Sequence, residues 1–75
     1  MDIKVLGTGC ARCHQLYDEV EKTLQTLGIQ ANLTRVERID QILQFQVMAT
    51  PAIVIDGKVK SAGRIPTTAE LTTWI

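Results

Sequence analysis

The sequence predicts a single α/β domain: a four-stranded mixed sheet with helices packed on it, in the order β-α-β-α-β-β-α. Two observations carry this prediction. Residues 2–36 pass from an apolar run through helical periodicity to an alternating pattern, which indicates a right-handed βαβ unit with parallel strands. Asp56-Gly57 lies between two strand-like runs and predicts a tight antiparallel hairpin. At 75 residues the chain is expected to form one domain over residues 1–75.

The first strand is expected over residues 2–6 and the first helix over residues 11–27. Gly28 follows at the position where a helix commonly ends. Together with Cys13, the apolar residues of this segment recur at helical spacing and predict one buried face: Leu16, Tyr17, Val20, Leu24 and Leu27.

Alternation of apolar and polar residues predicts a second strand from residue 29 to about residue 36. A second helix is expected over residues 38–46, with Ile39, Ile42 and Leu43 on its buried side. Thr50 precedes a proline and should therefore be extended, which places the end of this helix before it.

The last third of the chain carries the clearest local signals. Residues 52–55 and 58–62 flank the Asp-Gly turn and form the expected hairpin, closed by Gly63. Thr67 and Glu70 match a capping box that opens a final helix. That helix can dock through three residues at i, i+3 and i+4 spacing: Leu71, Trp74 and Ile75.

Composition excludes several classes of function. The chain has eight basic and eight acidic residues, so it lacks the basic footprint of a nucleic-acid-binding protein. No apolar run approaches the length of a membrane span, and the first residues lack the pattern of a signal peptide. We therefore expect a cytoplasmic protein. In that compartment two cysteines three positions apart point to redox chemistry or metal binding.

The two cysteines, Cys10 and Cys13, lie at the predicted start of the first helix. Unpaired N–H groups and the helix dipole favour a thiolate there. Cys10 is expected to attack a substrate disulfide, and Cys13, on the buried face, to resolve the mixed disulfide. Arg12 adds positive potential in the same turn, and His14 is a candidate modulator of the Cys10 pKa when protonated.

Three other interpretations of this motif are open. Cys10 and Cys13 could be buried small apolar residues, or they could carry a soft metal such as Cu(I). Soft-metal carriers with this motif follow a βαββαβ order, and the chain offers only His14 beyond the two thiols toward the four ligands of a zinc site. Cys10 to His14 also matches the haem-attachment pattern literally, with Met48 as a candidate axial ligand.

Two segments together, residues 7–13 and residues 50–58, resemble the thioredoxin fold. The chain looks most like the small microbial thioredoxin-like proteins called redox-active disulfide proteins. The resemblance covers nearly the whole chain. It implies a dithiol–disulfide oxidoreductase, an electron-transfer protein of cell redox homeostasis, whose only redox group is the Cys10–Cys13 disulfide, with no metal and no other cofactor.

The resemblance also implies a site larger than the two cysteines. Pro51 would form a cis peptide bond facing the disulfide, the backbone of Thr50 would pair with an extended substrate, and Gly63 would let the partner's backbone approach. Expected partners are a protein disulfide and a thioredoxin-reductase-like or other dithiol reductant. The protein is expected to be a monomer that binds neither nucleic acid nor membrane.

Some positions depart from the thioredoxin pattern. Gly9 stands where thioredoxins have a tryptophan, and Ala11-Arg12 replaces their Gly-Pro dipeptide. The first strand offers Lys4 and no buried acid. Gly9, Ala11 and Arg12 are therefore expected to support substrate binding and to set the specificity of this protein.

Overall fold

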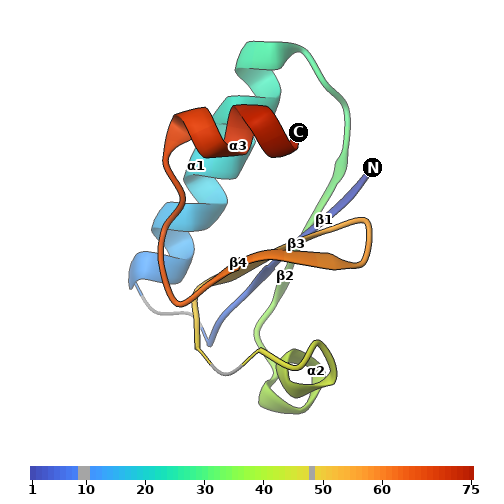
Figure 1. Ribbon diagram of the computed structural model, residues 1–75, viewed down its shortest axis with the longest axis vertical. Helices are drawn as coiled ribbons and strands as arrows, with labels where there is room; N and C mark the ends of the chain where they lie inside the picture. Colours follow the sequence, from blue (N-terminus) through green and yellow to red (C-terminus); the bar gives the residue numbers. More distant parts are fainter. Residues whose placement is uncertain (9–10, 48) are drawn as a thin grey trace.

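The computed structural model describes residues 1–8, 11–47 and 49–75, and Gly9, Cys10 and Met48 lie outside the described residues. The elements follow the expected β-α-β-α-β-β-α order (Figure 1). They are β1 (Asp2–Leu6), α1 (Ala11–Leu27), β2 (Asn32–Val36), α2 (Ile39–Gln44), β3 (Ala52–Ile55), β4 (Lys58–Ala62) and α3 (Thr68–Trp74).

The four strands form one mixed sheet in the order β2-β1-β3-β4. β1 pairs with β2 in parallel, and the β1–β3 and β3–β4 pairs are antiparallel. The βαβ unit and the hairpin thus meet at β1 and β3, the two central strands. Because the central strands are buried on both faces, β3 is apolar throughout, as its sequence Ala-Ile-Val-Ile requires.

Helices cover both faces of the sheet. α1 and α3 lie against each other on one face, and α2 lies on the other, at the opposite end of the view in Figure 1. The core under α1 and α3 is built from eight buried residues: Ile3, Val5, Leu16, Val20, Leu24, Ile53, Ile55 and Leu71. A smaller core under α2 contains Leu6, Val36, Ile42, Val47, Ala52 and Val54.

The local signals of the last third are confirmed. Asp56 and Gly57 both have positive φ, 51° and 82°, as a two-residue hairpin turn of this kind needs. The Thr67 hydroxyl accepts the Glu70 N–H, and the Glu70 carboxylate accepts the Thr67 N–H, which completes the capping box of α3. Leu71 is fully buried, while Trp74 and Ile75 are partly buried against the larger core.

The second strand is shorter than predicted. It begins at Asn32 rather than at residue 29, because the Ile29 N–H donates to the carbonyl of Leu24 and so closes the end of α1. Gly28 makes this closure possible with a φ of +67°. The strand begins only where the Asn32 N–H reaches the carbonyl of Met1 beside β1.

The predicted buried side of the second helix was wrong at two of its three residues. Ile42 is 5% exposed, whereas Ile39 and Leu43 are 64% and 62% exposed. The helix is only six residues long and covers one end of the sheet, so it buries little more than one side chain. Phe45 and Val47, which follow it, pack on the same core instead.

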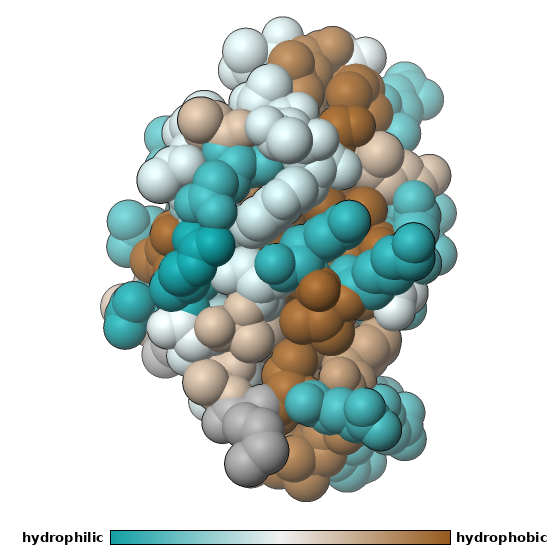
Figure 2. All heavy atoms as spheres, in the orientation of Figure 1, coloured by the Kyte–Doolittle hydropathy of each residue, from teal (hydrophilic) through white to brown (hydrophobic). Residues whose placement is uncertain are grey.

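Ile39 and Leu43 leave apolar surface on α2. In Figure 2, apolar side chains extend from the middle of the drawn face to the end that carries α2, and another apolar group lies at the opposite end. None of the helices in the described part of the chain combines the length and the apolar character that crossing a membrane would require.

Candidate active site

Cys13 lies in the first turn of α1 and is only 6% exposed. Its side chain packs against Gly7, the residue that follows β1. A Cβ atom at position 7 would overlap the Cys13 Sγ and would lie 2.9 Å from the Cys13 Cβ. Because Gly7 has no Cβ, the end of β1 packs directly against the Cys13 side chain. Residues 7–13 carry part of the family resemblance, but Gly7 was not among the predicted site residues, because this contact forms only when α1 packs on the sheet.

The loop that contains Thr50 and Pro51, called the Pro51 loop below, lies at the same end of the sheet. Leu6 is paired with Ala52 across the antiparallel β1–β3 ladder, so the next residues, Gly7 and Pro51, are adjacent at the ends of these strands. The Thr50–Pro51 peptide bond is cis, as the family resemblance implies, and Pro51 is buried. Gly7 and Pro51, which are 44 positions apart in the sequence (51 − 7), are thus brought together by one strand pair.

Gly63 joins this arrangement from the end of β4. Its N–H donates to the carbonyl of Pro51 at 2.9 Å, and its φ is +82°. A Cβ at this position would lie 3.0 Å from the Ala49 Cβ, which is closer than side chains normally approach. Position 63 therefore favours glycine for two reasons, a left-handed backbone and lack of space.

The remaining predicted site residues lie at the surface. Ala11, Arg12 and His14 are exposed on the first turn of α1, and Thr50 is exposed beside the buried proline. Gly9 and Cys10 lie outside the described residues, so the predicted geometry of the cysteine pair stays a prediction.

The structure adds two residues that the sequence analysis did not single out. A small cavity beside Cys13 and Gly7 is also lined by His14, Arg35 and Glu37. Arg35 and Glu37 come from β2 and the residue just after it, and the parallel β1–β2 pairing carries them to the end of the sheet where β1 also ends. That pairing was predicted, and it is the signal that could have identified them.

The charges in this region are partly engaged. The Arg35 guanidinium stacks on the Tyr17 ring, 4.4 Å from its centre, and lies 4.0 Å from the Glu37 carboxylate. Lys4 lies on the other face of the sheet, with its ammonium 5.5 Å from the centre of the Phe45 ring. The basic residue of β1 is therefore directed toward α2 and away from the face that carries α1.

Arg64 belongs to the scaffold of the Gly63 loop. Both of its terminal nitrogens donate to the Glu70 carboxylate, at 2.8 and 2.7 Å. This pair ties the residue after Gly63 to the capping box of α3. The hydrogen bonds from Arg64 and from the Thr67 backbone lower the pKa of Glu70 to about 2.

Within residues 1–8, 11–47 and 49–75 there is no cluster of three or more His, Cys, Asp or Glu side chains that could hold a metal ion. The helix between the second and third strands also distinguishes the fold from the βαββαβ order of small soft-metal carriers.

A buried cysteine in the first turn of a helix, beside a strand end and a cis-proline loop, defines the architecture of thioredoxin-like proteins. Comparison with known proteins agrees. The family model described as "Thioredoxin domain" matches residues 1–75. The chain belongs to this family.

Two proteins named thioredoxin are similar to the chain. The thioredoxin of Methanothermobacter thermautotrophicus is 35% identical over 71 residues, which is 95% of this chain and 92% of the relative. The thioredoxin of Methanocaldococcus jannaschii is 35% identical over 69 residues, covering 92% of this chain and 79% of the relative. These relatives support a disulfide oxidoreductase role in general and do not favour soft-metal carriage.

Proposed function

We propose that this protein reduces protein disulfides through the Cys10–Cys13 pair. The Cys10 thiolate attacks one sulfur of the substrate disulfide, forms a mixed disulfide and releases the first substrate thiolate. The Cys13 thiolate then attacks the Cys10 sulfur and releases the second. The substrate gains two electrons, and the protein is left with a Cys10–Cys13 disulfide that an external dithiol, such as that of a thioredoxin-reductase-like protein, reduces again.

The observation that carries this proposal is the position of Cys13. Its side chain is almost fully buried in the first turn of α1 and packed against Gly7, next to the Pro51 loop. A buried thiol at this place is shielded from solvent and suited to the resolving step, whereas the exposed first-turn residues Ala11, Arg12 and His14 are available to a partner. The exposed Thr50 backbone and Gly63 are proposed to pair with an extended segment of the substrate. This chemistry needs a dithiol reductant, and we propose that the protein works in the cytoplasm, where such reductants are available.

Replacement of each cysteine in turn tests the proposal. Cys13→Ser should abolish turnover in a disulfide-reduction assay with dithiothreitol and insulin, and should accumulate Cys10-linked mixed disulfides with partner proteins. Cys10→Ser should also abolish turnover but accumulate none, which makes it the matched control. Retention of turnover in either variant would refute the mechanism. Thiol counting of the oxidised wild type should show loss of two thiols without formation of a dimer.

A further inference from the structure

We propose that the free edge of β2 and the groove beside it bind an extended polypeptide segment that adds a fifth strand to the sheet. The groove extends from Tyr17 toward the carboxyl end of α1, and only the Arg35 end of the β2 edge lies near Cys13. The proposal does not depend on the redox chemistry proposed above. The partner segment is inferred to have apolar side chains at alternate positions and a basic side chain that reaches Glu21.

The backbone N–H and C=O groups of alternate β2 residues point in opposite directions. The Asn32 N–H donates to the carbonyl of Met1, and the Gly7 N–H donates to the carbonyl of Val36. In a parallel ladder these bonds alternate, so the even-numbered residues of β2 face β1. The N–H and C=O groups of Leu33 and Arg35 therefore point away from the sheet. Among the described residues they have no hydrogen-bond partner, as a strand edge open to pairing requires.

The two edge strands of the sheet, β4 and β2, differ in the features that prevent pairing with another strand. β4 carries the exposed Lys58 and Lys60, and its pairing with β3 is irregular between Ile53 and Val54. Lysines and bulges are the usual features that prevent an edge from pairing. The β1–β2 register is regular over all five residues, and β2 has neither lysine nor proline. The edge at β4 is protected against pairing, and the edge at β2 is open.

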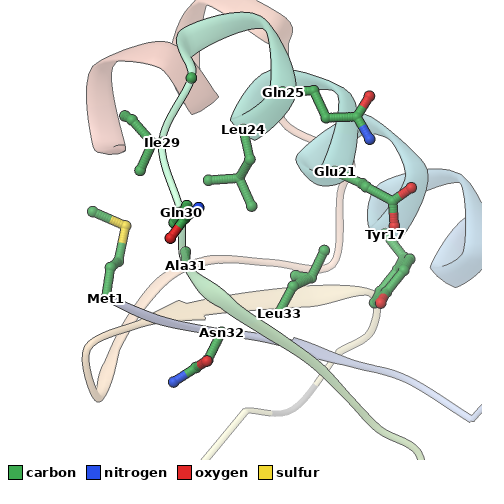
Figure 3. Close-up of a pocket in the computed structure, with 11 residues that line it drawn as sticks. Met1, Tyr17, Glu21, Leu24, Gln25, Ile29, Gln30, Ala31, Asn32 and Leu33 are labelled. Atoms are coloured by element: carbon green, nitrogen blue, oxygen red, sulfur yellow. The ribbon is translucent and has the colours of Figure 1, made fainter.

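A groove with a volume of about 880 Å³ lies next to the β2 edge. Figure 3 shows Leu24 of α1 and Leu33 of β2 pointing toward each other across it, with Tyr17 at one end and Ile29 at the other. Leu33 lies on the α1 face of the sheet, so alternate side chains of an added strand would also point to that face, into the groove. Those side chains would meet the partly buried Leu33 and Ile29, within a lining whose exposed surface is more polar than apolar.

The rim of the groove indicates the charge of the partner. Glu21 is the only charged side chain among the described residues that line it. The other polar side chains are the Tyr17 phenol and three amides: Gln25, Gln30 and Asn32. A basic side chain on the added strand would pair with Glu21. A second copy of this chain fits less well, because pairing of two β2 strands about Thr34 places Arg35 of one copy opposite Leu33 of the other. On the α1 face of the sheet, the Arg35 guanidinium of one copy would then lie beside the Leu33 side chain of the other copy.

The probe for this proposal is an acetylated and amidated hexapeptide of alternating valine and threonine with a lysine at one end. Titration of the full-length protein with this peptide, followed by amide NMR shifts and hydrogen exchange, should show binding in the millimolar range. The amides of Leu33 and Arg35 should become protected, and those of Asn32 and Thr34, which already face β1, should change little.

Two sets of variants make the test specific. N-methylation of one set of alternate peptide N–H groups should weaken binding at least about tenfold, and N-methylation of the other set should have little effect, because only one set faces β2. Glu21→Lys should weaken binding of the lysine peptide, whereas Asp18→Lys, the same charge change on the same helix outside the groove, should not. Absence of amide NMR shift changes at Leu33 and Arg35 would overturn the proposal. Equal effects of N-methylation at both sets of alternate positions would also overturn it. So would protection of these amides that depends on protein concentration without peptide, since the occupant would then be a second copy.

Discussion

The contact between Gly7 and Cys13 leads to a sharp prediction for Gly7→Ala. The added Cβ would overlap the Cys13 Sγ and lie 2.9 Å from the Cys13 Cβ. Rotation of the single side-chain torsion can move the Sγ but not the Cβ, which is fixed to the backbone. The end of β1 and the first turn of α1 must therefore move apart. Overpacking of this kind costs about 1–3 kcal/mol of unfolding free energy. The same movement displaces the thiol, so we expect the rate of disulfide reduction per folded molecule to fall as well.

Gly57→Ala is the matched control for Gly7→Ala. Gly57 has a φ of +82°, and a Cβ added there would meet no neighbouring atom within 4 Å, so alanine at this position is strained only in its backbone. A left-handed alanine costs about 1–2 kcal/mol, comparable to the effect at position 7. Urea denaturation should therefore show similar destabilisation of both variants, while disulfide reduction by the folded protein should fall only for Gly7→Ala.

A double-mutant cycle with Cys13→Ala isolates the contact itself. Without the Sγ atom, Gly7→Ala should cost less, and the coupling energy between the two positions should lie in the range of about 0.5–3 kcal/mol seen for residues in contact. If Gly7→Ala leaves stability and the rate of reduction unchanged, or if the coupling energy is zero, the inferred packing of the β1 end on Cys13 is incorrect.

Other predictions test the scaffold around the site. Ile42→Ala should lower the unfolding free energy by about 2–5 kcal/mol, whereas Leu43→Ala should change it by less than about 0.5 kcal/mol in the same urea titration. Thr67→Ala removes the cap of α3 and should cost about 1 kcal/mol, measured in the same way. The pKa of Glu70 is lowered to about 2, so its contribution is complete above the ordinary value of 4.5 and is lost as the pH falls toward 2. The melting temperature of Glu70→Gln should therefore be lower than that of the wild type at neutral pH and should converge with it near pH 2.

Much of the fold could be predicted because its signals are local. The Asp56-Gly57 turn and the Thr67–Glu70 capping box each involve residues within three positions, and their backbone requirements are specific. The order of elements followed from these signals and from periodicity, and it was correct. The family resemblance pointed to the Pro51 loop, and the Leu6–Ala52 pairing shows physically why that loop reaches the cysteine end of the sheet.

The failures have a common cause, which is that burial depends on what lies opposite a residue. Ile39 and Leu43 have helical spacing with Ile42, yet α2 is too short and too near the end of the sheet to cover them. In the same way, no pattern within the sequence shows that Gly7 is pressed against Cys13. These features appear only when elements that are distant in sequence are packed together.

Cys13 lies in the first turn of α1, whereas the groove beside β2 extends from Tyr17 to the carboxyl end of that helix, so variants in the groove can test the second site separately. Cys13 and Gln25 are twelve residues apart on one helix, which corresponds to about 18 Å at 1.5 Å per residue. A partner strand on β2 would therefore lie mostly away from Cys13, with only its end at Arg35 near the small cavity beside that cysteine. It would position a substrate without itself taking part in the exchange reaction. If one partner uses both sites, Glu21→Lys should raise the KM for that substrate and leave kcat unchanged, because the chemical step at Cys10 and Cys13 does not involve the groove. A fall in kcat with unchanged KM would instead mean that the groove is linked to the packing of Cys13.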